Sequence, residues 1–95
     1  MFSYSQIKRL KSLHQKKYRQ QEKEILLEGH RLILQALIAE ADIKQAWMTE
    51  NYAKSTSGIR LSKMLAENNI IIDMAFQKSI DNICDSKNSQ GIIAV

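Results

Sequence analysis

The residues best suited to chemistry lie in a short basic run near the start of the chain. Lys16, Lys17 and Arg19 follow one another closely, with Tyr18 among them. Lysine and arginine bind phosphate groups, and arginine can do so with two parallel hydrogen bonds, so this run suits the backbone of a nucleic acid. Tyr18 can stack on an unpaired base or pack over the preceding helix, and the sequence leaves both open.

The distribution of charge supports an anionic partner. The formal net charge is +4, and residues 1–21 contain six basic residues and no acidic one. Residues 22–95 contain eight basic and ten acidic residues and therefore carry −2. A cationic N-terminal element on a slightly acidic body is typical of proteins that bind polyanions. A solvated helix face is the alternative, and we assign Lys8, Arg9 and Lys11 individually to such a face.

No catalytic or metal-binding arrangement is recognisable. The three glycines are isolated, so neither a dinucleotide fingerprint nor a P-loop can be drawn. His14 and His30 have no further ligand at metal-binding spacing. The one cysteine, Cys84, excludes an internal disulfide and falls on the apolar side of a predicted helix, where a buried thiol is expected. We therefore predict that this chain alone is not an enzyme and holds no metal.

The basic run lies after a helix that the sequence marks clearly. Ser3 and Gln6 match a capping box, and apolar residues at helical spacing predict a helix over residues 4–14. Residues 15–23 are polar and basic and are predicted to form a connector. A mobile connector would let residues 16–19 follow a nucleic-acid backbone.

Short apolar runs and helical patterns alternate through the rest of the chain. Strands are predicted at residues 25–28, 43–48, 70–72 and 91–95, and helices at 30–41, from 59 until the pattern fades at 67–69, and at 76–84. Residues 49–58 are predicted to form a polar loop, and residues 85–90 a turn. This alternation is typical of an α/β layer fold with a mostly parallel four-stranded sheet covered on both faces.

The length and hydropathy of the chain limit its class. Ninety-five residues allow one domain. No apolar run approaches the ~20 residues of a membrane-spanning helix, and no secretory signal is recognisable, so we expect a cytoplasmic domain. The chain closes on apolar residues without a polar tail, which predicts that it is part of a longer protein.

Three stretches of the sequence occur in a recognisable order. They are the helix leading to Lys16–Arg19, the apolar strand ending in Glu28-Gly29, and the closing segment Gln90-Gly91-Ile92-Ile93-Ala94-Val95. Together they resemble the N-terminal substrate-binding domain of SpoU-type (TrmH family) RNA 2′-O-ribose methyltransferases. The resemblance covers nearly the whole chain.

This resemblance implies a fold and a role. The fold would be a three-layer α/β/α sandwich similar to the kink-turn-binding ribosomal proteins, and the role would be to hold structured ribosomal or transfer RNA. A knotted catalytic domain would follow residue 95, bind S-adenosylmethionine and methylate a ribose 2′-hydroxyl, so no cofactor is expected in this chain. Homodimers would form through that second domain, and this chain alone is expected to be a monomer.

The resemblance also bears on the candidate RNA-binding residues. It favours RNA contact for the basic residues from Lys16 to Arg19 over mere solvation. Arg31 lies within the first turn of the helix that begins after Gly29, where RNA contact and pairing with Glu28 are both open. The residues after Gly29 differ from the Asn-Glu pair with which the ribosomal proteins read kinked RNA, so kink-turn recognition is not carried over.

Two other classes of function stay open. The basic N-terminal helix could dock on an acidic protein, in which case the chain is a protein-interaction module. A small independent enzyme is the third hypothesis, and the sequence offers no catalytic arrangement for it.

Overall fold

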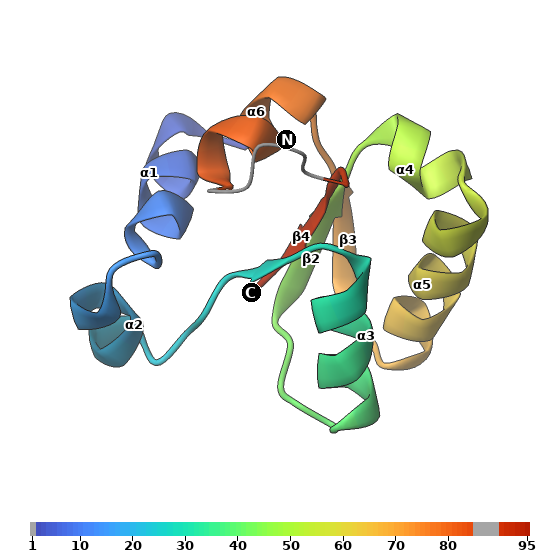
Figure 1. Ribbon diagram of the computed structural model, residues 1–95, viewed down its shortest axis with the longest axis horizontal. Coiled ribbons are helices and arrows are strands. Elements are labelled where there is room, and N and C mark those ends of the chain that lie inside the picture. The colour runs from blue at the N-terminus through green and yellow to red at the C-terminus, as the bar shows by residue number, and fades with distance from the viewer. Residues whose placement is uncertain (1, 85–89) are drawn as a thin grey trace.

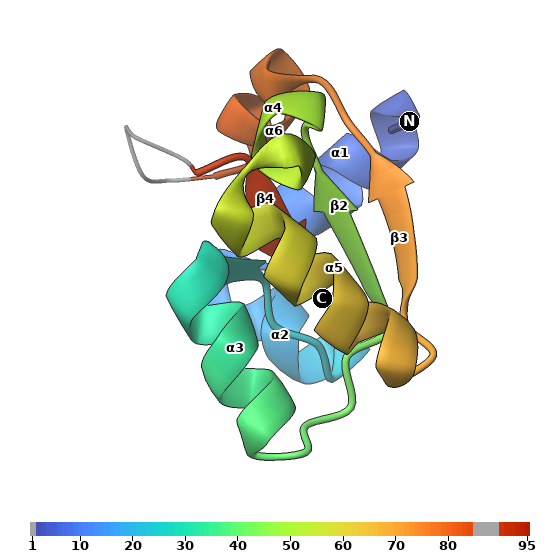
Figure 2. The same ribbon diagram turned by 90° about the vertical axis from the view of Figure 1, so that its right-hand side faces the viewer.

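The computed structural model describes residues 2–84 and 90–95. Within these residues the chain forms α1 (Tyr4–Ser12), α2 (Lys16–Glu22), β1 (Leu27–Glu28), α3 (His30–Ile38), β2 (Gln45–Met48), α4 (Glu50–Lys54), α5 (Thr56–Glu67), β3 (Ile71–Met74), α6 (Gln77–Ile83) and β4 (Ile92–Ala94). The strands lie between two layers of helices, with α1, α2 and α6 on one side and α3, α4 and α5 on the other (Figures 1 and 2). In this described part, no helix is long and apolar enough to cross a membrane.

The sheet is mixed, so the predicted mostly parallel sheet is wrong. The strand order is β1-β4-β2-β3. Only β2 and β3 are parallel neighbours, whereas β4 runs antiparallel to both β1 and β2. The broader prediction of an α/β fold with a four-stranded sheet is confirmed.

The direction of β4 follows from where the chain re-enters the sheet. Met48 lies beside Met74, the last residue of β3, and also beside Ile92, the first residue of β4. The chain therefore returns at the same end of the sheet that it left, and α6 lies near that end (Figure 1). A parallel connection needs a crossover that runs back along the strands. An antiparallel return and a parallel crossover give the same alternation of helix and strand in the sequence. The alternation therefore does not predict the direction of β4.

Each face of the sheet is covered by its own apolar core. Residues of α3, α4 and α5 pack on Ala46, Met48 and neighbouring side chains of β4. Residues of α1 and α6 pack on Trp47 and Ile93, which point to the opposite face. Trp47 is 3% exposed, and its ring centroid lies 5.0 Å from that of Phe2, so this tryptophan anchors the core on the α1/α6 side.

Two segments predicted to lack regular structure are helical. The connector at residues 15–23 contains α2, which consists of good helix formers but buries no residue and so has no apolar stripe to reveal it. The loop at residues 49–58 contains α4 and the start of α5. Thr49 Oγ1 accepts a hydrogen bond from the Tyr52 amide, and Ser55 Oγ accepts one from the Gly58 amide, so α4 and α5 each have their own N-cap.

The other predicted helices and strands are confirmed with shifted ends. The capping box at Ser3 and Gln6 is present, with both of its hydrogen bonds, and α1 ends two residues earlier than predicted. The turn predicted at residues 85–90 falls largely outside the described residues.

Candidate nucleic-acid interface

The basic N-terminal segment forms two consecutive helices rather than a helix and a mobile connector. Lys16 and Lys17 are exposed on α2. The Lys17 ammonium lies 5.4 Å from the centre of the Tyr18 ring, within the range of a cation–π contact. The structure thus places Lys16, Lys17 and Tyr18 on one turn of helix.

Arg19 connects these two helices. Its guanidinium nitrogen Nη1 donates to the carbonyl oxygens of Leu13, at 3.1 Å, and His14, at 2.9 Å, where α1 ends. A cation at a helix C-terminus satisfies free carbonyl groups and interacts favourably with the helix dipole. Arg19 is half-buried in this role. Its predicted contact with RNA stays a prediction.

His14 ties the end of α1 to the last helix of the chain. Its Nε2 lies 2.6 Å from the carbonyl oxygen of Ile83, at the end of α6, and its Nδ1 lies 3.9 Å from a carboxylate oxygen of Glu28. His14 therefore contacts both α6 and β1 from the end of α1. In the described residues, no group of three or more metal-binding side chains is present.

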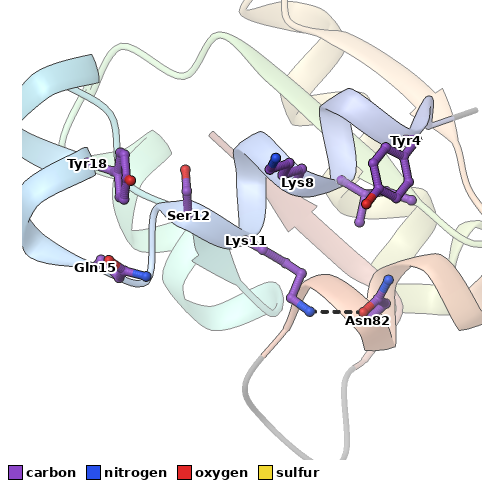
Figure 3. A pocket seen from close by; sticks show the side chains of 8 residues that line it. Tyr4, Lys8, Lys11, Ser12, Gln15, Tyr18 and Asn82 are labelled. Carbon is purple, nitrogen blue, oxygen red and sulfur yellow. Dashed lines mark hydrogen bonds between the residues drawn. The ribbon is translucent and has the colours of Figure 1, made fainter.

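A surface hollow of about 570 Å³ runs along α1. It is lined by Tyr4, Ile7, Lys8, Lys11, Ser12, Gln15, Tyr18 and Asn82. Tyr4 lies at one end and Tyr18 at the other, with Lys8 and Lys11 between them (Figure 3). The Lys11 ammonium donates to Asn82 Oδ1 at 3.2 Å, which joins α1 to α6 across the floor of the hollow. Among these lining residues there are two lysines and no acid.

A second hollow, of about 810 Å³, adjoins the first. It is lined by Ile7, Phe76, Lys78, Ser79, Asp81 and Asn82, so Ile7 and Asn82 form the shared border. The Asp81 carboxylate accepts a hydrogen bond from the Gln77 side chain at 2.8 Å. We call the two hollows together the α1/α6 groove. Its lysines and aromatic rings make it suited to an anionic chain that carries flat ring systems.

Arg31 lies elsewhere on the molecule. It is exposed in the first turn of α3, and α3 packs on the opposite face of the sheet from α1. The structure therefore does not bring Arg31 together with Lys16 and Lys17. Gly29, which precedes α3, has a φ of +95°, a backbone conformation that favours glycine over residues with a Cβ. The Gln90 Oε1 atom accepts a hydrogen bond from the His30 amide at 2.8 Å.

The comparison with family models decides what the chain is related to. Residues 5–94 match the model described as the MRM3-like substrate binding domain. The chain belongs to this family. It is therefore an MRM3-like substrate-binding domain, and the family resemblance that the sequence predicts is confirmed.

Solved structures share the fold of this substrate-binding domain. A crystal structure of an RNA 2′-O ribose methyltransferase superposes with a TM-score of 0.83 at 24% identity, covering 97% of this chain and 34% of that one. An rRNA methyltransferase from Sinorhizobium meliloti gives 0.73 at 19% identity, with 99% of this chain and 34% of that one covered. A putative RNA methyltransferase of the TrmH family from Porphyromonas gingivalis gives 0.69 at 22%, again covering 99% and 34%.

These comparisons leave the whole protein's activity open. The domain spans about a third of the length of the structures it matches. A comparison with curated proteins found no match. Because these three structures are methyltransferases, the likeness to kink-turn-binding ribosomal proteins stays a prediction.

Most of the residues that line the α1/α6 groove cannot be identified from the sequence as site residues. The sequence assigns Lys8 and Lys11 to a solvated face and Phe76 to the apolar pattern of the last helix, and it does not single out Tyr4 or Asn82. One signal was present, because Tyr4, Lys8, Lys11 and Gln15 recur at intervals of four, three and four and so share one face of a helix. The contribution of α6 had no such signal.

Proposed function

We propose that this domain recognises RNA for an RNA 2′-O-ribose methyltransferase and positions structured ribosomal or transfer RNA for a separate catalytic domain. The observation that carries the proposal is the basic two-helix layer of α1 and α2 in a chain of the MRM3-like substrate-binding family. Residues 1–95 form the recognition domain, and the catalytic domain follows residue 95. That second domain binds S-adenosylmethionine, forms the homodimer and works in the cytoplasm.

The RNA contacts proposed for α2 follow from its exposed cations. Lys16 and Lys17 are exposed, so their ammonium groups can pair with phosphates. Tyr18 supplies a ring beside them, and Arg19 joins α2 to the end of α1 through its bonds to the carbonyl oxygens of Leu13 and His14. Arg31 makes a separate contact from the other helical layer. Affinity rests mainly on phosphates, because lysine and arginine side chains pair with phosphate groups whatever the base sequence.

The salt dependence of binding tests this proposal. The domain would be titrated with a labelled, structured ribosomal-RNA fragment at several salt concentrations. With about four phosphates engaged, the slope of log affinity against log salt should be near −3. The double variant Lys16→Gln/Lys17→Gln should bind more weakly and reduce the size of the slope by about 2.

A matched variant on the other helical layer controls for net charge. Lys54 and Lys63 are exposed on α4 and α5, on the opposite side of the sheet from α2 (Figure 1). Lys54→Gln/Lys63→Gln removes the same charge and should leave the slope nearly unchanged. If the two double variants lose affinity equally, the contact is not at α2. If the unmodified domain binds no RNA at low salt, the proposed function is wrong, and retention of one acidic protein would then favour a protein-interaction module.

A further inference from the structure

All the aromatic residues that do not pack in the two cores line the α1/α6 groove. The chain has six aromatic residues. Trp47, Phe2 and Tyr52 belong to the two cores or pack against them. The other three, which line the groove, are Tyr4, Tyr18 and Phe76. Three rings on one surface are therefore not accounted for by folding.

One of these rings lies at a position that costs the fold stability, and a second is largely exposed. Phe76 is the N-cap of α6 and is 62% exposed. An N-cap favours a side chain with an oxygen that can bond the first free amides, which phenylalanine lacks. Tyr4 is the first residue of α1 and is 83% exposed. Residues that break a local rule without a gain in packing are expected at functional sites.

Cations are interleaved with these rings. Lys8 and Lys11 lie between Tyr4 and Tyr18 along α1 (Figure 3), and Lys78 lines the adjoining hollow with Phe76. The described lining includes one acid, Asp81, whose carboxylate is held by Gln77. The groove thus offers positive charge beside exposed ring faces, which complements a strand of phosphates carrying accessible bases.

We propose that the α1/α6 groove binds a single-stranded segment of RNA, with unpaired bases stacked on Tyr4 and Phe76 and phosphates bound by Lys8, Lys11 and Lys78. This inference rests on the proposed function and specifies the part of the RNA that is bound. Bases inside a duplex have both faces covered by their neighbours, so only a loop, a bulge or a free end can present them to these rings. Stacking tolerates any base, so the groove selects strandedness rather than sequence.

A binding comparison at fixed salt tests the inference. A labelled single-stranded RNA oligomer of mixed sequence would be titrated with the domain, and so would the same strand annealed to its complement. The single strand should bind about tenfold tighter or more, because stacking adds to phosphate contact only there. Tyr4→Ala and Phe76→Ala should each weaken single-strand binding by about tenfold, and Tyr4→Phe should stay within about twofold of the unmodified domain.

Two further readings separate stacking from charge and from folding. Tyr4→Ala should leave the salt slope unchanged because it removes no charge, unlike the Lys16→Gln/Lys17→Gln variant. Ile38→Ala/Ile59→Ala removes two exposed apolar side chains from the opposite helical layer, 71% and 62% exposed, and should leave RNA binding intact. The fluorescence of the single tryptophan, Trp47, reports whether each variant is folded.

The outcomes distinguish the inference from the function on which it rests. If duplex and single strand bind equally and the alanine variants bind as the unmodified domain does, the groove does not stack bases, while RNA recognition through α2 stands. If neither form of RNA binds, both proposals are wrong. Preference for the single strand that is lost in Tyr4→Ala and retained in Tyr4→Phe supports the inference.

Discussion

Replacing Glu24 with glutamine tests how α1 is held against the sheet. The Glu24 side chain is only 5% exposed and lies between two cations. Its Oε1 accepts a hydrogen bond from the Arg9 guanidinium on α1, and its Oε2 lies 3.4 Å from the Lys44 ammonium, next to the start of β2. One buried carboxylate therefore connects the helix that carries the α1/α6 groove with the central strand. Glutamine preserves the shape and removes the charge.

The expected loss of stability follows from the burial of the carboxylate. A hydrogen bond to a charged group contributes about 1.5–3 kcal/mol. Arg9 and Lys44 are 46% and 57% exposed, and water screens them, which places the loss near the lower bound. For a domain of this size, 1 kcal/mol corresponds to about 4–8 °C in the melting temperature. Glu24→Gln should therefore lower the melting temperature by at least about 6 °C.

Glu50→Gln provides a matched control with the same change in net charge. Glu50 pairs with Lys54 at 3.0 Å on α4, and both side chains are more than 70% exposed. Such a pair contributes about 0.3–0.5 kcal/mol, so this variant should melt within about 1–4 °C of the unmodified chain. Thermal unfolding would be followed by the fluorescence of Trp47 and by circular dichroism, under the same buffer conditions.

Equal melting temperatures of the two variants would refute the reasoning. That result would mean that water screens the Glu24 site as fully as it screens the exposed pair on α4. A fall confined to Glu24→Gln, with weaker binding of single-stranded RNA by the destabilised domain, would show that the placement of α1 matters for the groove as well as for folding.

Two further predictions concern the helical layer formed by α3, α4 and α5. A Cβ at Gly58 would lie 1.7 Å from the Tyr52 carbonyl oxygen, so Gly58→Ala must move α4 against α5 and should cost about 1–3 kcal/mol or more, measured by urea unfolding against Ser57→Ala as control. Burial raises the pKa of Tyr52, so the folded state favours the neutral phenol. The resulting stability is complete below the ordinary tyrosine pKa of about 10 and is lost as pH rises through the raised value. Tyr52→Phe should therefore reduce the fall in melting temperature between about pH 9 and 11, and an equal fall in both proteins would contradict this.

The sequence predicted those elements whose local signals are strong. The capping box at Ser3 and Gln6 and the apolar spacing of residues 7–13 identified α1, and alternating apolar runs identified the four strands. The direction of β4 was not predictable in this way, because it depends on the end of the sheet at which the chain returns after α6. Helices α2 and α4 were missed because one buries no residue and the other is only five residues long.

The candidate site was also predictable only in part, because some of its features follow from the local sequence and others depend on how the chain folds. The exposure of Lys16 and Lys17 follows from their polar surroundings in the sequence. The capping role of Arg19 does not, because it requires α2 to fold back toward the last carbonyl groups of α1. The groove is harder to predict, because its two walls come from distant parts of the chain. Lys11 and Asn82 are 71 residues apart and meet only in the folded domain.

The concentrated positive charge of this domain lies in residues 1–21, whereas the shape of the α1/α6 groove also depends on α6. All six cations of residues 1–21 would be present in an isolated basic peptide, which would attract any polyanion. The second wall of the groove comes from α6, which is held against α1 by His14 at Ile83 and by Lys11 at Asn82. Discrimination between single and double strands can arise only where rings and cations are fixed relative to one another. In the proposed groove, the fold would add selectivity for single strands to the attraction that the basic sequence supplies.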